Sequence, residues 1–427
     1  AGTLANAMTF ANNAKLSLAA DATLSGALTL NGALNVASDS AKTVTLSGAI
    51  SGNGGFNIGN SATVKLAGTT ATTISGNVTG TGKLQLASGT TTTFNGGENN
   101  TLILGANIAV ESGATVNLGG TIEIQNAIQN AGTITLGSGI VFNLNSNVPA
   151  GTNYTFNLIS GGTINGIEWN ALTKDNFTYN GDAMDRFDIN VGTAGTVVLT
   201  STDCVWNGGE SGTWETNGVW TYGGSATNWV AGKNAVFQTT NASVTIGSAV
   251  TVANVYIEEN TTITGIGYLT LGEGKSIVIS NEKTLTLGGD ALAGLTKNVT
   301  GTGTLKLALS NDWNNTIKLN SGTEGATSAF AGTVHITDGR FTINNSNIGN
   351  AAYVLDGNTG FQVSGSAATI ANAITFTGGT HEFHTNSGAN LTLTGDFTVE
   401  SGTTVTKNGA AVFAIQGNAK IDGTFTR

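Results

Sequence analysis

The chain has 427 residues, of which 10% are charged, and its formal net charge is −10. Ordinary soluble domains carry about 25% charged residues, so disorder driven by charge is excluded, and 39% hydrophobic residues suffice for a thin, continuous core. The acidic balance argues against nucleic acid and anionic membranes as partners. No apolar run approaches the roughly 20 residues that cross a bilayer, so we expect no membrane-spanning segment.

Residues that form turns and strands dominate the composition. There are 62 glycines and a single proline, Pro149. Glycine and asparagine supply the positive φ angles of tight turns, whereas threonine, valine and isoleucine favour strands. No long stretch has helical periodicity. The composition therefore predicts an all-β protein.

The first hundred residues carry a 20-residue spacing of aliphatic side chains, within short stretches that alternate apolar and polar residues. Alternation places the aliphatic side chains on one face of a strand, and such a strand cannot bury that face alone. A fixed period indicates that neighbouring copies bury it for each other, which predicts a parallel solenoid, an elongated rod of stacked coils. The recurring residues are Leu24, Val44, Val64, Leu84 and Leu104, with Leu46, Leu66 and Leu86 two places later.

The first block is assigned to residues 1–203. Alternating apolar pairs continue through Phe142 and Leu144, and further strands are predicted at 154–159 and 195–200. Between these two strands lies a non-repetitive segment near 160–190, which we interpret as a surface insert.

Three aspartates, Asp182, Asp185 and Asp188, make the insert the best acidic candidate in the chain. On a strand, Asp182 and Asp188 would share a face; on a loop, the three carboxylates could hold Ca²⁺. Arg186 lies among them and favours a solvated loop that pairs with itself. We therefore expect no metal and no cofactor.

The second block, 204–427, opens with a tryptophan-rich segment. These aromatic rings could form an exposed platform that stacks on sugar rings, or could pack against the first rung of the block; we favour packing. The single cysteine, Cys204, cannot form an intrachain disulfide and is expected to be buried. The aromatic residues are Trp206, Trp214, Trp220, Tyr222 and Trp229.

Two sequences recur across the blocks. Val-Thr-Gly-Thr-Gly-Lys-Leu-Gln-Leu at 78–86 matches 299–307, and Thr-Leu-Ala-Asn-Ala-Met-Thr-Phe at 3–10 matches 369–376. The chain begins with alanine, as a mature or excised piece would, and it ends without the polar cap that solenoids usually need. We expect two open ends that each accept another rung, and hence self-association.

Several motifs resemble the autotransporter-associated β-strand repeat of bacterial surface proteins. They are Val-Trp-Asn-Gly-Gly-Glu-Ser-Gly-Thr-Trp at 205–214, Thr-Asn-Trp at 227–229, Ala-Val-Phe at 235–237 and the rung at 330–343. The likeness covers most of 205–343 and parts of 47–166. It implies a right-handed parallel β-helix exported to or through a bacterial outer membrane, usually as an adhesin or structural passenger.

An enzyme is the least favoured class. Glycoside hydrolysis needs two carboxylates at a defined separation, whereas Glu111 and Glu123 are isolated in the repeats. Zinc needs three or four convergent ligands, and we see no such set around the three histidines. We predict that the protein is not a polysaccharide lyase or hydrolase.

The expected function is an extracellular scaffold of a bacterial surface, assembling end to end into a fibre or array. The alternative is an adhesin that binds glycans or proteins through a side face. Both follow from the resemblance and from the repeats, because repetition specifies a scaffold and not a ligand.

Replacement of Leu66 by aspartate tests the predicted inside and outside of the coil. Leu66→Asp should destabilise the protein by on the order of 4 kcal/mol, because it places an unpaired charge in the core. Thermal unfolding measures this, and wild-type melting of the variant would refute the assignment.

Overall fold

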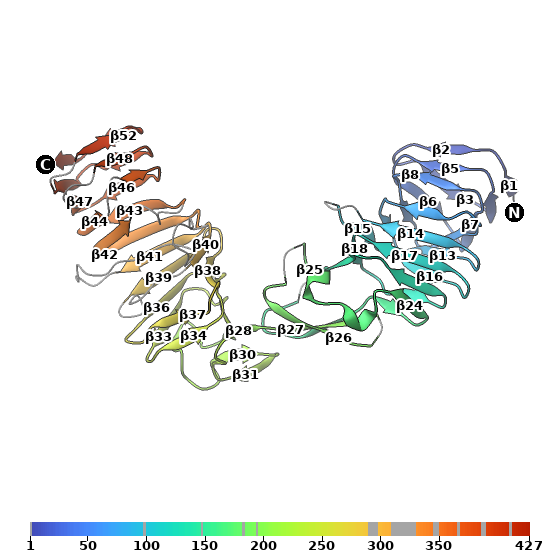
Figure 1. Ribbon diagram of the computed structural model, residues 1–427, viewed down its shortest axis with the longest axis horizontal. Helices are drawn as coiled ribbons and strands as arrows, with labels where there is room; N and C mark the ends of the chain where they lie inside the picture. The colour runs from blue at the N-terminus through green and yellow to red at the C-terminus, as the bar shows by residue number, and fades with distance from the viewer. Residues whose placement is uncertain are drawn as a thin grey trace. The chain divides into compact units, whose positions relative to one another are not determined.

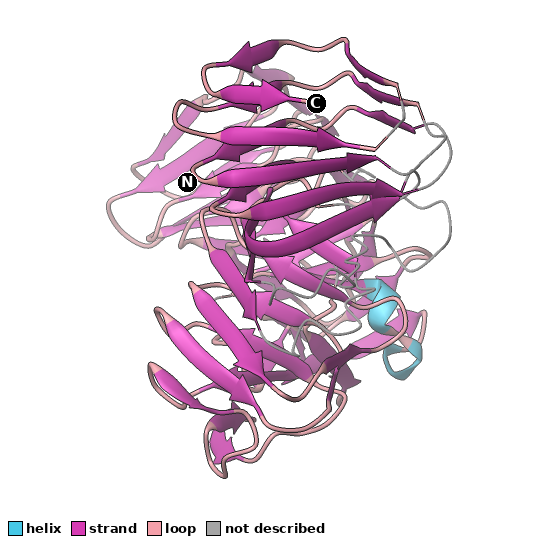
Figure 2. Cartoon of the chain, turned by 90° about the vertical axis from the view of Figure 1, so that its left-hand side faces the viewer, coloured by secondary structure: helices cyan, strands magenta, loops and turns pink. Residues whose placement is uncertain are grey.

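The computed structural model describes residues 2–96, 100–146, 148–181, 184–193, 195–288, 298–308, 330–344, 350–364, 368–385, 390–409 and 412–427. Contacts divide the chain into two compact units, Ala1–Ser201 and Thr202–Arg427. Both are built mainly of parallel strands, with about 17 stacked coils in the described residues. The predicted all-β solenoid is confirmed, and Figure 2 shows how completely strands make up the chain.

The unit Ala1–Ser201 has three long faces (Figure 1). Each coil contributes one strand to a face, and the parallel strands of successive coils pair side by side. The first face contains β1 (Gly2–Leu4), β4 (Ala22–Leu24), β7 (Lys42–Leu46), β10 (Ala62–Leu66), β13 (Lys83–Leu86), β16 (Asn107–Val110), β19 (Ile128–Asn130) and β23 (Ile159–Ser160). The second contains β3 (Lys15–Leu18), β6 (Leu34–Ser38), β9 (Phe56–Ile58), β12 (Val78–Thr79), β15 (Leu102–Leu104), β18 (Thr121–Ile124), β21 (Val141–Leu144) and β25 (Phe177–Tyr179). The third contains β2 (Met8–Phe10), β5 (Leu28–Leu30) and β8 (Ile50–Gly52), followed by β11 (Thr72–Ile74), β14 (Thr91–Asn95), β17 (Thr115–Gly119), β20 (Thr133–Leu136) and β24 (Thr163–Gly166).

The 20-residue register holds in the middle of this unit and changes on either side. Val44, Val64 and Leu84 stack directly on one another, as predicted. Leu24, however, stacks on Leu46 instead of Val44, and Leu84 is followed by Ile108 instead of Leu104. The extra residues enter the connections between strands, so the strands keep their alternation of inward and outward side chains.

Unit Ala1–Ser201 also contains antiparallel strands that sequence periodicity did not predict. β27 (Thr196–Ser201) pairs antiparallel with both β22 (Tyr154–Asn157) and β26 (Phe187–Val191). Such pairing differs from the parallel rungs in direction, yet Val197 and Leu199 of β27 still belong to the core.

The expected surface insert near 160–190 requires correction. β24 and β25 continue the parallel stack, and two single-turn 3₁₀-helices, Trp169–Ala171 and Lys174–Asn176, connect them. Trp169, Leu172 and Phe177 are buried in the core. The segment looked non-repetitive because its rung strands are separated by these turns. No helix in the described residues is long and apolar enough to cross a membrane.

The unit Thr202–Arg427 repeats the architecture. One sheet contains β31 (Ser225–Thr227), β30 (Trp220–Tyr222), β28 (Asp203–Trp206), β32 (Asn234–Phe237), β35 (Val255–Ile257), β38 (Ser276–Ile279) and β40 (Asn298–Gly301). The largest contains β29 (Ser211–Thr213), β33 (Ala242–Ile246), β36 (Thr261–Gly265), β39 (Thr284–Gly288), β41 (Thr304–Ala308), β42 (Thr333–Asn344), β43 (Ala352–Asp356), β44 (Thr359–Ser364), β46 (Ile374–Thr377), β47 (Thr380–Thr385), β49 (Phe397–Val399), β50 (Thr404–Asn408), β52 (Ala419–Ile421) and β53 (Thr424–Thr426). Two small sheets contain β34 (Val250–Val252) and β37 (Leu269–Leu271), and β45 (Ala368–Ile370), β48 (Leu391–Leu393) and β51 (Phe413–Ile415).

The recurring sequence at 78–86 and 299–307 includes a corner of the coil. In 78–86 and 299–307, the glycines Gly80 and Gly301 have φ angles of 95° and 96°. A Cβ atom on either would lie 2.1 Å from the carbonyl oxygen of the coil below, that of Ile58 or Ile279. Glycine is therefore required twice at this corner, by its backbone angle and by the close approach of two coils.

Gly80→Ala should lower the free energy of unfolding by about 2–4 kcal/mol, since it combines a left-handed backbone with a clash against Ile58. Gly89 is the matched control, because it has a φ of 80° but open space around the added Cβ. Gly89→Ala should cost only about 1 kcal/mol. Chemical denaturation of both variants measures the difference, and equal losses would show that the close approach of the coils contributes nothing.

Candidate functional site

A polar groove of about 550 Å³ lies in the unit Ala1–Ser201. The last two residues of β18, the residues that follow β18 and β21, and the strand β22 line it. The residues that matter for its chemistry are Glu123, Gln125, Asn126, Asn145, Tyr154 and Phe156.

Glu123 is buried although it points away from the core. In β18, Ile122 and Ile124 face inward, so alternation turns Glu123 outward, yet its exposed fraction is only 4%. Its carboxylate accepts hydrogen bonds from the amides of Gln125 (2.7 Å), Asn143 (2.8 Å) and Asn145 (3.1 Å). No ion pair among the described residues includes it. Neutral amides thus satisfy a buried carboxylate.

Asn143 is itself held in a fixed orientation by the next coil. Its Oδ1 atom accepts hydrogen bonds from the Thr178 hydroxyl (3.0 Å) and from the Gly181 backbone N–H (2.8 Å). This leaves the Nδ2 amide to donate to Glu123. The network therefore runs through three successive coils and makes the floor of the groove rigid.

Tyr154 stands on the wall of the groove. Its exposed fraction is 43%, and its ring makes an edge contact with Phe156 at a centroid distance of 4.8 Å. β22 is paired along its length with β27, where Tyr154 lies opposite Leu199 and Phe156 opposite Val197. An exposed aromatic ring therefore stands on a strand that is anchored to the core.

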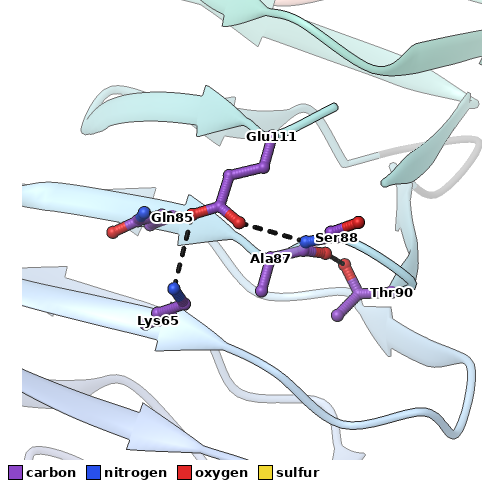
Figure 3. A network of polar contacts seen from close by, with 6 residues as sticks. All are labelled: Lys65, Gln85, Ala87, Ser88, Thr90 and Glu111. Carbon is purple, nitrogen blue, oxygen red and sulfur yellow. Dashed lines mark hydrogen bonds and ion pairs between the residues drawn. The ribbon is translucent and has the colours of Figure 1, made fainter. Parts of the chain in front are cut away.

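A second carboxylate network, on the first face of the same unit, is more exposed (Figure 3). Glu111 receives hydrogen bonds from the side chains of Lys65 (3.4 Å) and Gln85 and from the Ser88 backbone N–H (3.1 Å). The Ser88 N–H and the Gln85 amide hold the pKa of Glu111 below its usual range. Both side chains of the Lys65–Glu111 ion pair remain about one-third exposed, so this network ties coils together on a solvated face.

The tryptophan cluster (Trp206, Trp214, Trp220 and Trp229) lies in the unit Thr202–Arg427. Trp206, Trp214 and Trp220 have exposed fractions of 2% or less, and Trp214 and Trp220 lie 4.7 Å apart, centroid to centroid. Trp229 and Tyr222 are partly buried against the same core. The buried rings present no face to solvent, so an exposed sugar-stacking platform built on them is wrong.

The motif around Trp206 has a packing explanation. Its ring lies against Gly208, where an added Cβ would come within 2.3 Å of the indole, and its Nε1 donates to the Gly209 carbonyl at 2.9 Å. The two glycines therefore make room for the ring and accept its N–H. Cys204 is buried as expected, and burial raises the pKa of its thiol to about 11.

Of the three aspartates, Asp182 lies outside the described residues. Asp185 and Asp188 are exposed, the first in the turn before β26 and the second within it. No group of three or more potential metal-ligating side chains was found in the described part of the chain. Neither Asp185 nor Asp188 is among the residues that line the groove.

The groove itself was missed, although the repeat contained a signal for it. Glu123 has no acidic neighbour in the sequence, but Asn143 follows it by 20 residues and Asn145 by 22. About one coil length therefore separates the carboxylate from two of its three amide donors. Tyr154 carried no comparable signal, because antiparallel pairing with β27 decides its position.

Glu123→Ala should lower the free energy of unfolding by about 2–3 kcal/mol, because three amide donors lose their acceptor. Glu111→Ala, which removes a carboxylate with similar donors on an exposed face, should lower the free energy of unfolding by less.

The lowered pKa of Glu111 means that its contribution to the free energy of unfolding is present at neutral pH and is lost as the pH falls through the carboxyl range. Urea denaturation at two pH values measures both effects; an equal loss for both variants at neutral pH would contradict the buried role of Glu123.

Comparison of the chain with models of protein families finds no match. Comparisons with curated protein sequences and with solved structures likewise find no significant match.

Proposed function

We propose that the protein is an extracellular structural scaffold of a bacterial surface, built like an autotransporter passenger, that assembles rung on rung into a longer fibre or array. The motif resemblance supports the location. The stacked coils support the scaffold role, since a solenoid gains stability from each neighbouring coil.

One observation carries the assembly proposal. The sequence at 3–10 forms β1 and β2, and its counterpart at 369–376 forms β45 and β46. β46 has a strand on each side, β43 and β49, and its Phe376 is completely buried. Phe10, at the matching position in β2, is only partly buried. A rung from a second copy laid on β2 would bury Phe10 as Phe376 is buried.

The groove favours a second function, that of an adhesin that binds a glycan through a side face. A rigid floor of amides beside an exposed tyrosine is typical of a binding surface. A catalytic role is not proposed, because glycoside hydrolysis needs two carboxylates and Glu123 is the only one among the described residues that line the groove.

Sedimentation velocity over a wide range of concentrations, with electron microscopy of the same samples, tests assembly. Wild-type protein should form linear species that grow with concentration. Phe10→Ser should reduce them, since it removes the apolar surface that a second copy would cover. Ile266→Ser is the control, because Ile266 is 78% exposed in the other unit. Monomers alone at every concentration would count against the scaffold proposal, as would equal assembly of Phe10→Ser and wild type.

A further inference from the structure

We propose that the groove beside Tyr154 binds a neutral saccharide chain. This inference rests on the adhesin form of the proposed function and assigns it a site and a class of ligand.

The charge of the lining selects against ionic ligands. The described residues of the lining include no lysine, arginine or histidine, so uronic acids, sialic acids, sulfates and phosphates find no cation there to pair with. Its one carboxylate, Glu123, is buried and already accepts three amide hydrogen bonds. Because these donors enclose the carboxylate and leave it only 4% exposed, it is poorly accessible to a cationic ligand, and a neutral ligand fits best.

Amide side chains offer hydrogen bonds to hydroxyl groups. Asn145 donates one N–H to Glu123, and Asn126 donates one to the Gly105 carbonyl at 2.6 Å. These bonds orient both amides but leave each with a second N–H and a carbonyl oxygen. Both side chains are exposed at the groove, as is that of Asn157 on β22. Paired donors and acceptors of this kind match vicinal hydroxyl groups, which both donate and accept.

Tyr154 supplies an apolar surface for a sugar ring. Its contact with Phe156 fixes the ring, while its 43% exposure keeps it accessible. An aromatic ring beside polar groups suits a pyranose, which has apolar C–H faces and a polar rim. The groove volume of about 550 Å³ lies within the range of ordinary ligand sites.

The site is organised before any ligand arrives. β22 is held by β27, the loop before it is tied down by a hydrogen bond from the Gly151 N–H to the Ser201 hydroxyl (3.1 Å), and the floor is fixed by the network through Glu123 and Asn143. Binding therefore costs little ordering of the protein.

Titration calorimetry of the whole chain tests the proposal with cellohexaose, chitohexaose and maltohexaose as neutral probes and hexagalacturonate as the anionic probe. At least one neutral probe should bind, and hexagalacturonate should not. Tyr154→Ala should weaken binding at least tenfold, whereas Tyr154→Phe, which keeps the ring, should restore it to within a few-fold of wild type. Tyr268→Ala is the control, because Tyr268 is 51% exposed in the other unit.

The proposal is overturned if none of the neutral probes binds, if Tyr154→Ala binds as wild type does, or if hexagalacturonate binds as tightly as the neutral probes. Its failure is separable from that of the scaffold proposal. Phe10→Ser, designed to reduce assembly, should bind the saccharide as wild type does, and Tyr154→Ala should assemble normally in sedimentation. Thermal melting of each variant shows that it is folded.

Discussion

Every coil of this protein completes the core of its neighbours, and the rest of the structure depends on that constraint. A strand such as β10 has three inward side chains, Ala62, Val64 and Leu66, and Val64 and Leu66 are covered because β7 and β13 lie in register on either side. The backbone ladder and the apolar stack therefore form together. Insertions are tolerated in the connections, as the altered spacing around Leu24 and Leu84 shows, because they leave the strand faces unchanged.

The same constraint explains the glycine corners. Coils that stack in register bring their backbones into contact where the chain turns, so a side chain at Gly80 or Gly301 would collide with the coil below. It also explains the covering of the first rung in the unit Thr202–Arg427. There, Trp206, Trp214 and Trp220 pack around Phe237 of β32.

The groove arises where the repetition stops being regular. Glu123 occupies an outward position that would ordinarily be solvated, but amide side chains beside it and on the following coil enclose it. The antiparallel strand β22 then adds Tyr154 as a wall. The regular coils make the site rigid, and the strand β22 outside the regular repeat adds the exposed aromatic ring. Many proteins likewise carry their functional groups on irregular segments held by a rigid scaffold.

The sequence by itself determined the all-β solenoid, the inward residues and the burial of Cys204, because two-residue alternation and a period near 20 are local patterns that strands must obey. It did not determine where the coils would lengthen. The 20-residue spacing predicted that Leu24 stacks on Val44, whereas it stacks on Leu46. It also misread 160–190 as a surface insert, because rung strands separated by 3₁₀ turns show no period. Only the tertiary structure decided the groove. Asn143 lies one coil from Glu123 and was recognisable from the repeat, but Tyr154 reaches the site through pairing with β27, and contacts between such distant segments depend on packing and not on local pattern.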